Sequence, residues 1–539
     1  MSDKPQQSST VTLTLDGNEI SVPRGSTLIE AAEQAGVRVP HYCYHPGLSS
    51  PAMCRLCLVE VEGAPKLQPS CVTMAQDGQT VHTNSQEARK QRQGVLEFYL
   101  VNHPLDCPIC DQSGECKLQD YVFAEGRKHG RSQEPKRVFG RDDFGGDVLF
   151  YGDRCVMCTR CVRFMDEVAG DPRLTVVERG DRAIIDTFFE EGLSGSPFAG
   201  NIVDICPVGA LVSKDFLHKA RAWDLDHTPS VCTSCSQGCN IQIHTRDNEV
   251  QRLKPRENLE VNGFWMCDEG RHNYEWMNSP HRLEVPRVSE VAGESPVAMG
   301  WGRALDALLP ALREGGPVMA VASPFASNED LGALAHLVER LGGGDLVFRS
   351  PEAETEVVLP GFPQLVRRRD LSPNRTGAEL LGFRRVGDAQ GQGGLEAAAA
   401  HDGILLILGD ELRDQEADFG TKARFLVRLG STASGVEAAH AHLPITTHAE
   451  QDGSFANHEG RVQRFWPALK GPGAARPAWM ILGTLAARLD PEAMEEGPGS
   501  AAEAFHRLVA AHGPFAGMSF DALGTRGVPV SQPAALQGA

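Results

Sequence analysis

The sequence predicts a multidomain protein with small α+β modules in its N-terminal half and an α/β region in its C-terminal half. A chain of 539 residues is too long for one hydrophobic core, because domains usually hold about 100 to 200 residues. All 15 cysteines lie between Cys43 and Cys267. Beyond about Pro286, short apolar runs alternate with helical patterns, which is typical of an α/β fold.

Charge and hydropathy narrow the function classes. The 52 basic and 71 acidic side chains give a formal net charge of −19, which disfavours nucleic acid or an anionic membrane surface as a direct partner. No run approaches the ~18 apolar residues of a membrane span, and the N-terminal segment lacks the apolar core of a secretory signal. We therefore expect a cytoplasmic protein whose cysteines serve metal or redox centres, with a disulfide scaffold as the weaker alternative.

Residues 10–85 predict a ferredoxin-like α+β domain. The runs VTLTL and EISVP flank a turn at residues 16–18 and predict a hairpin, and Thr27 with Glu30 forms a capping box before a helix that stops at Gly36. One loop and a distant fourth thiolate are typical of a [2Fe–2S] site, and a single CxxC makes structural zinc less favoured. The first ligand set is Cys43, Cys54, Cys57 and Cys71.

Residues 86–126 predict a helix from Ser85 to about Val101, followed by a second cysteine set that supplies only three thiolates. This second set is Cys107, Cys110 and Cys116. A cubane needs four ligands, and no cysteine is left over. The residues alone leave the fourth ligand open between the imidazole of His103 and three harder oxygen donors, Asp106, Asp111 and Glu115.

Residues 140–218 predict a two-cluster ferredoxin module from which one cluster has been lost. In such modules CxxCxxCxxxCP occurs twice, and each fourth cysteine binds the other cluster. Here Met165 replaces the first copy's fourth cysteine, and the second copy keeps only its last cysteine, with Ser196, Ala199 and Ile202 in the other places. The third ligand set is therefore Cys155, Cys158, Cys161 and Cys206.

Three arginines surround the third set, namely Arg154, Arg160 and Arg163. Two interpretations of them stay open: they offset the negative charge of a cluster, or they are simply solvated.

Residues 225–285 predict a further cluster domain with four cysteines of its own. Zinc is a stronger rival at this set because the set opens with a CxxC, but the three-residue gap before Cys239 suits a cubane better. The fourth ligand set is Cys232, Cys235, Cys239 and Cys267.

The remaining chain predicts an α/β region over residues 286–523 and a disordered tail over 524–539. We expect buried strands at 318–322 and 404–408, helices at 304–312 and 331–341, and a loop at 388–394. A GxGxxG motif that opens a helix after a strand is missing, and the glycines at 342–344 are too few and wrongly spaced.

Taken together, these motifs resemble the family of the large iron–sulfur subunit of NADH-quinone oxidoreductase, the respiratory complex I. The resemblance is close over about the first 285 residues and implies a β-grasp fold for the [2Fe–2S] domain. HxxxCxxCxxxxxC resembles the family's His-plus-three-Cys site, which implies His103 as the sixteenth ligand. The implied cofactors are one [2Fe–2S] cluster and three [4Fe–4S] clusters, the last resembling an additional site inherited from molybdopterin oxidoreductases.

The C-terminal half resembles a shortened molybdopterin domain, most clearly at residues 448–463. Three departures imply that no molybdopterin binds: the half is short, no cysteine follows Cys267, and Glu269 stands where active relatives typically have lysine. We interpret this half as a structural remnant, with docking as its remaining use.

The resemblance implies an electron-transfer subunit of the peripheral arm, without catalytic residues or NADH and quinone sites of its own. It would receive electrons from a flavin-bearing, NADH-oxidising subunit and pass them towards quinone, on the cytoplasmic side of the plasma membrane and without membrane insertion. The alternative is the iron–sulfur subunit of an NAD-linked formate dehydrogenase or a hydrogenase. The lost ferredoxin half disfavours the hydrogenase, and the missing lysine disfavours the formate dehydrogenase.

Overall fold

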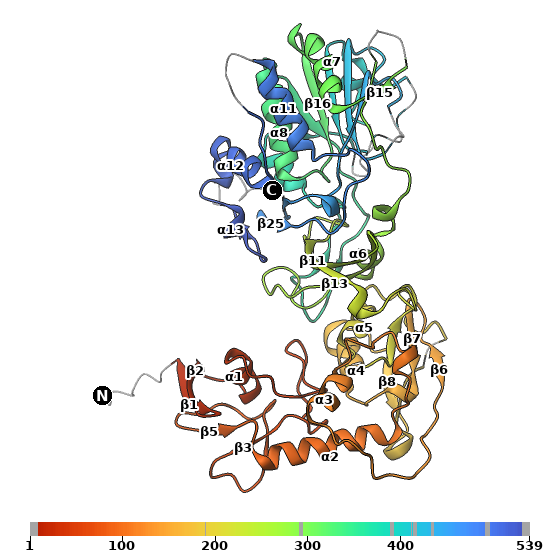
Figure 1. The fold of residues 1–539 in the computed structure, drawn as a ribbon, viewed down its shortest axis with the longest axis vertical. Coiled ribbons are helices and arrows are strands. Elements are labelled where there is room, and N and C mark those ends of the chain that lie inside the picture. Colours follow the sequence, from red (N-terminus) through yellow and green to blue (C-terminus); the bar gives the residue numbers. More distant parts are fainter. Residues whose placement is uncertain are drawn as a thin grey trace, which may run out of the picture. The chain divides into compact units, whose positions relative to one another are not determined.

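The residues described by the computed structural model are 9–188, 190–289, 295–388, 393–410, 412, 415, 418–432, 436–490 and 496–530. Contacts divide the chain into two units. The first holds Met1–Asp224 with Leu359–Phe362, and the second holds Leu225–Val358 with Pro363–Ala539. Figure 1 shows the first unit mainly in red to yellow and the second mainly in green to blue.

The first unit begins with a sheet that packs on one helix. Its elements are β1 Thr10–Leu15, β2 Asn18–Pro23, α1 Leu28–Gln34, β3 Leu58–Val61, β4 Gln68–Pro69 and β5 Thr80–His82. Among the described residues the sheet has five strands in the order β2-β1-β5-β3-β4, and β1 and β5 are parallel. The predicted hairpin and both hydrogen bonds of the capping box between Thr27 and Glu30 are confirmed.

The rest of the first unit consists of short elements that place cysteine loops. They are α2 Gln86–Asn102, η1 Cys107–Ile109, α3 Lys117–Glu125, β6 Arg141–Asp143, β7 Val148–Tyr151, η2 Gly152–Arg154, α4 Arg160–Arg163, η3 Phe164–Val168, β8 Leu174–Val177, η4 Gly180–Arg182, β9 Ile184–Thr187, α5 Asn201–Ile205, β10 Leu211–Ser213 and η5 Ala222–Asp224. The helix expected from Ser85 is confirmed as α2, because the Ser85 hydroxyl accepts a hydrogen bond from the Ala88 amide.

The second unit opens with an antiparallel sheet that carries the fourth cysteine set. The elements here are β11 Asp226–Val231, β12 Asn240–Arg246, β13 Glu249–Pro255, α6 Asp268–His272 and η6 Glu275–Asn278. Cys232 follows β11, Cys239 precedes β12, and Cys267 is the N-cap of α6. The fourth set is therefore attached to regular structure at three points.

The C-terminal region is built on a large sheet. Its elements are β14 Arg287–Val288, β15 Val297–Ala298, α7 Trp301–Arg313, β16 Val318–Ala322, α8 Asn328–Arg340, β17 Asp345–Phe348, β18 Val357–Val358, β19 Val366–Arg367, α9 Arg375–Leu380, β20 Arg384–Arg385, α10 Glu396–Ala400, β21 Ile404–Leu408, β22 Phe425–Gly430, β23 Ala441–Pro444, η7 His448–Glu450, β24 Gly453–Ala456, β25 Arg461–Phe465, α11 Ala478–Leu489, α12 Ala501–Ala511, η9 Gly513–Phe515, α13 Phe520–Leu523 and β26 Val528–Pro529. In the described residues the sheet order is β15-β14-β23-β22-β21-β16-β17-β20, with neighbours parallel from β23 to β20.

Both faces of this sheet are covered, which explains why its central strands are apolar throughout. Ala320 belongs to a core shared with α7, α8, α11 and α12, whereas Met319 and Val321 belong to a separate core on the other face. Strands buried on both faces lose the alternation of polar and apolar residues. The strands predicted at 318–322 and 404–408 are confirmed, and the two predicted helices correspond to α7 and α8.

One sequence-based boundary is wrong. The sequence predicts a disordered tail from residue 524, but β26 pairs with β25 and Val530 is buried. The strand β26 consists of two residues, Val528 and Pro529, which are too few to show a periodic pattern. Its pairing with β25 therefore could not be predicted from the neighbouring sequence. Residues 531–539, and 389–392 of the expected loop, lie outside the described residues. No helix in the described ranges is long and apolar enough to cross a membrane.

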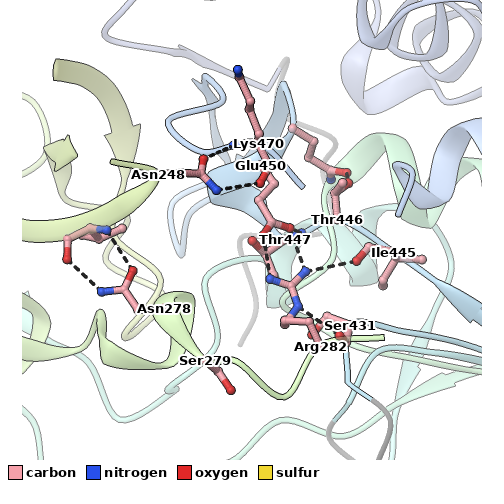
Figure 2. Close-up of polar contacts among 12 residues, drawn as sticks. Asn248, Asn278, Ser279, Arg282, Ser431, Ile445, Thr446, Thr447, Glu450 and Lys470 are labelled. Carbon is pink, nitrogen blue, oxygen red and sulfur yellow. Dashed lines mark hydrogen bonds and ion pairs between the residues drawn. The ribbon is translucent and has the colours of Figure 1, made fainter. Parts of the chain in front are cut away.

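A polar network joins the fourth-set module to the C-terminal region within the second unit (Figure 2). The guanidinium of Arg282 forms two bonds, of 2.6 and 2.8 Å, with the Glu450 carboxylate, and it donates to the carbonyls of Ser431 and Ile445. Asn248 bonds both backbone groups of Lys470. The Arg282–Glu450 pair is almost fully buried. Removing either side chain would leave the other as an uncompensated buried charge, which strongly destabilises a fold.

Candidate iron–sulfur ligand sets

The four cysteines of the first set are buried together in the loops between α1 and β5. A hydrogen bond to Cys57 and burial raise the pKa of Cys71, and the charges of Cys43 and Cys54 raise it further. The matching hydrogen bond lowers the pKa of Cys57 to about 7, and one from Cys43 lowers that of Cys54 to about 5. Lowered pKa values favour the thiolate, which is the form that binds metal.

Residues with left-handed backbone flank both Cys54 and Cys158. Two residues other than glycine have left-handed backbone on either side of Cys54, Ala52 with φ 54° and Arg55 with φ 58°. Thr159, with φ 56°, follows Cys158 directly, and Met157, with φ 49°, precedes it. Such conformations cost free energy and cluster at functional loops, which fits both loops being shaped around a bound group.

The second set lies around a short 3-10 turn. Cys107 begins the turn, Cys110 ends it, and Cys116 is the N-cap of α3. Burial, with smaller effects of the charges of Cys110 and Cys107, raises the pKa of Cys116 to about 11, so the three cysteines lie near one another. A Cβ atom on Gly209 would lie 2.2 Å from Cys110 Sγ, so the backbone after Cys206 approaches this sulfur closely.

His103 is the C-cap residue of α2 and lies half-buried. Burial, with smaller effects of Lys136 and Arg154, lowers its pKa to about 4, so the imidazole is neutral at pH 7, as metal ligation requires. Two of the oxygen alternatives have other partners: Asp106 pairs with Arg154 at 3.0 Å, and Asp111 pairs with His218 at 3.2 Å. Glu115 also has an interaction of its own.

The third set lines one pocket. Cys155, Cys158, Cys161 and the distant Cys206 share its wall with apolar residues of β7, β9 and β10. Burial raises the pKa of Cys161, and the charges of Cys158, Cys155 and Cys206 raise it further. The positions of the lost second cluster are buried among apolar groups, with Met165 and Ile202 both 0 % exposed.

The solvated interpretation of the nearby arginines is wrong for two of them. Arg154 and Arg160 are buried, and Arg163 is half-buried with its guanidinium on backbone carbonyls. The Arg154 guanidinium pairs with Asp106 and donates to the Gly209 carbonyl.

The fourth set is buried in the second unit. The Cys267 sulfur accepts a hydrogen bond from the Gly270 amide at 3.3 Å, and a Cβ atom on Gly270 would lie 3.0 Å from Cys232 Sγ. Burial raises the pKa of Cys239, and the charges of Cys232, Cys235 and Cys267 raise it further. The Gly270 position is therefore close to both the Cys232 and the Cys267 sulfur.

Residues 448–463 hold the loop of the fourth set. Gln463 donates to the Gly238 carbonyl at 2.8 Å, Asn457 donates to the Gln237 carbonyl at 3.3 Å, and the His458 amide donates to the Ser236 carbonyl at 2.8 Å. The segment that resembles a molybdopterin domain therefore hydrogen-bonds to the loop between Cys235 and Cys239. Glu269 pairs with Arg367 at 3.1 Å.

The donor sets fit clusters in sulfur type and, for most sulfurs, in burial: Cys107 is exposed, Cys155 and Cys206 are half-buried, and the other twelve cysteines are buried. Among the described residues, no three His, Cys, Asp or Glu side chains are placed to hold one metal ion. Sequence reasoning found every cysteine but missed the supporting groups, Gly209, Gly270 and the carbonyl contacts of Arg160. The segment Cys206-Pro207-Val208-Gly209 could have indicated that a glycine lies close to a cysteine ligand.

Sequence models of five families match the chain in the order expected for its modules. Their descriptions are a 2Fe-2S iron-sulfur cluster binding domain at 8–86, the NADH-ubiquinone oxidoreductase-G iron-sulfur binding region at 92–131, the ferredoxin-like domain of NADH-quinone oxidoreductase subunit 3 at 145–212, a molybdopterin oxidoreductase Fe4S4 domain at 225–279, and molybdopterin oxidoreductase at 370–488.

Similar proteins carry related names. An NADH-quinone oxidoreductase subunit of Rickettsia felis is 39% identical over 62% of this chain, which spans 50% of that relative's length. The mitochondrial NADH-ubiquinone oxidoreductase 78 kDa subunit of Candida albicans is 31% identical over 89% of this chain and 83% of that relative. A solved NAD+-reducing [NiFe]-hydrogenase structure is 32% identical over 39% of this chain and 90% of that chain, with a TM-score of 0.36.

Proposed function

Because this chain belongs to the family that contains this NADH-quinone oxidoreductase subunit and the mitochondrial 78 kDa subunit, we propose that it relays single electrons within the peripheral arm of such a complex. Electrons enter from a flavin-bearing subunit that oxidises NADH and leave towards quinone, coupled in the whole complex to proton translocation. The NADH, flavin and quinone sites belong to other subunits. The chain is peripheral, on the cytoplasmic side of the membrane.

We assign one [2Fe–2S] cluster to the first set, one [4Fe–4S] cluster to each of the others, and no molybdopterin. The proposed ligands are Cys43, Cys54, Cys57, Cys71, His103, Cys107, Cys110, Cys116, Cys155, Cys158, Cys161, Cys206, Cys232, Cys235, Cys239 and Cys267. The proposed domains are residues 10–85, 86–126, 140–218, 225–285 and 286–523. The first four are close to the ranges that family models match, and the fifth contains a matched range at 370–488.

The observation that carries this proposal is the pocket of the third set. Cys206 lies far along the chain from Cys155, Cys158 and Cys161, yet the four line one cavity. Crossed ligation between the halves of a ferredoxin module requires this arrangement. A scaffold stabilised by zinc has no need to combine a CxxCxxC triad with a remote CP pair.

The chain's own residues hold, shield and space the clusters. Bound clusters accept and release one electron at a time. Thiolates, most of them buried, hold the clusters, and apolar neighbours such as Phe150 and Ile185 shield the third set. The loops of the first and third sets are neighbours, because the Arg163 guanidinium donates to the carbonyls of both Cys43 and Cys158. Burial raises the pKa of Tyr99, and the charges of cysteines from both sets raise it further. Burial raises the pKa of Tyr42, and the charges of Cys116 and Cys54 raise it further. Tyr42 is therefore close to both the second and the first set, which supports a series of three clusters in the first unit.

Metal analysis and paramagnetic resonance of the full chain test this function. We expect about fourteen irons per chain from the cluster types proposed, and no zinc. Cys206→Ala is expected to remove the third-set signal and about four irons while the other signals remain. A colourless zinc protein, or a Cys206→Ala protein with every cluster signal intact, contradicts the proposal.

A further inference from the structure

Arg160 lies between the loops of the first and third ligand sets. Its side chain is 3% exposed. One terminal nitrogen donates to the carbonyl of Ile205, directly before Cys206, at 3.0 Å, and the other donates to the carbonyl of Tyr44, directly after Cys43. The guanidinium therefore contacts the backbone beside a ligand of each set.

No carboxylate among the described residues neutralises this buried cation. Within the described part of the chain no Asp or Glu pairs with Arg160, and its Nε atom has no hydrogen-bond partner. Arg160 lines the same pocket as the four cysteines of the third set. A buried charge without a compensating charge is strongly unfavourable, so the negative charge must come from the cysteine sets.

Two other buried arginines of the same unit are neutralised by carboxylates. Arg154 pairs with Asp106, and Arg92 pairs with Glu125 and also donates to the Thr83 carbonyl. Arg160 differs from both, since its two described hydrogen bonds go to backbone carbonyls and none goes to a carboxylate. Other titratable groups facing this region are Arg163, Lys117, His41 and His45. Arg163 is half-buried, and burial lowers the pKa of Lys117 to about 8 and those of His41 and His45 to about 3.

We propose that Arg160 is the counter-ion of the third cluster, shared with the first, and that its permanent charge raises the reduction potential of the third cluster. The inference rests on the proposed function, since it requires clusters at these sets. A positive charge in a poorly solvated site stabilises the reduced state, which carries one more negative charge. Arginine suits this use because its guanidinium stays protonated at every relevant pH.

Arg163 complements Arg160 by holding the same two loops together. Its guanidinium donates to the Cys43 carbonyl at 2.6 Å and to the Cys158 carbonyl at 3.2 Å, and also to the Ser49 carbonyl. Because Arg163 is partly solvated, its charge is screened more than that of Arg160. Arg163 therefore holds the two loops together, and Arg160 supplies the less screened positive charge near the third cluster.

A redox titration of the full chain, followed by paramagnetic resonance, tests the role of Arg160. The third-set signal is first identified by its loss in Cys206→Ala. Arg160→Gln is expected to lower the reduction equilibrium constant of that cluster roughly tenfold, which is 59 mV for a one-electron couple. Arg160→Lys keeps the charge and is expected to stay within about threefold of the unaltered chain. Arg92→Gln, at a neutralised buried arginine, is the matched control and should leave the potential unchanged.

The outcomes show whether the positive charge of Arg160 or only the packing of its side chain affects the third cluster. An Arg160→Gln potential equal to that of the unaltered chain overturns the inference and leaves the proposed function standing. Equal shifts in Arg160→Gln and Arg160→Lys also overturn it. If Arg160→Gln folds but loses the third cluster while Arg160→Lys keeps it, the counter-ion role is supported; loss in both overturns it. An unaltered chain without any third-set signal refutes the proposed function itself.

Discussion

Replacing Gly209 with alanine tests whether close backbone approach builds the second cluster site. The added Cβ atom would lie 2.2 Å from Cys110 Sγ and 3.1 Å from Gln112 Cβ. Non-bonded heavy atoms prefer separations of roughly 3.5 to 4.0 Å, so the sulfur or the loop must move by about 1.5 Å. Overpacking of this kind typically costs ~1–3 kcal/mol. The change alters no ligand, and Gly209 has no left-handed backbone that alanine would strain.

The assay is the second-set paramagnetic signal, measured against the third-set signal of the same sample. We expect Gly209→Ala to lose most of the second-set signal and up to about four irons per chain. Gly270→Ala is the milder companion at the fourth set, because its Cβ atom would lie 3.0 and 3.4 Å from two sulfurs. Gly94→Ala is the matched control in α2, since nothing lies within 4 Å of its Cβ position.

The loss of cluster signal should be largest in Gly209→Ala, smaller in Gly270→Ala and absent in Gly94→Ala. Gly94→Ala should leave every signal unchanged and stabilise the chain by about 0.5–1 kcal/mol, because alanine favours a helix interior. A Gly209→Ala chain with a full, unaltered second-set signal would refute the reasoning that this glycine makes room for the Cys110 thiolate.

Three further predictions concern separate parts of the chain. His103→Ala should change the second-set signal, since it removes the proposed fourth ligand, while the other signals stay as controls; an unchanged signal sinks the ligand assignment. Removing either partner of the buried Arg282–Glu450 pair, by Arg282→Met or Glu450→Gln, should cost about 3–5 kcal/mol in urea unfolding, because the remaining group loses its compensating partner; a loss below about 1 kcal/mol would place the pair among weak surface bridges. Burial raises the pKa of Glu329 from 4.5 to about 8, so the folded chain keeps a proton that the unfolded chain releases. Stability from this group should therefore fall by at most ~1.4 kcal/mol per pH unit as pH rises through this window, and Glu329→Gln should flatten the dependence; identical pH profiles would show that the group titrates normally.

Local patterns predicted the regular elements that depend on neighbours in sequence. The hairpin of β1 and β2, the capped helix α1 and the buried strands β16 and β21 each follow from a short stretch of residues. The pairing of Val528–Pro529 with β25 could not be predicted in this way. It depends on a partner strand that is distant along the chain, and two residues carry no periodicity of their own.

The sequence by itself also predicted the donor sets, because crossed ligation ties cysteine spacing to cluster chemistry. The pocket that Cys206 lines with Cys155, Cys158 and Cys161 agrees with the grouping predicted for the third set. Only the tertiary structure decided what surrounds these donors. It buried Arg160 between two carbonyls and brought Gly209 against Cys110. The physical reason is that spacing records how a loop closes on its own ligands, whereas burial, screening and close approach arise from packing between segments that share no local pattern.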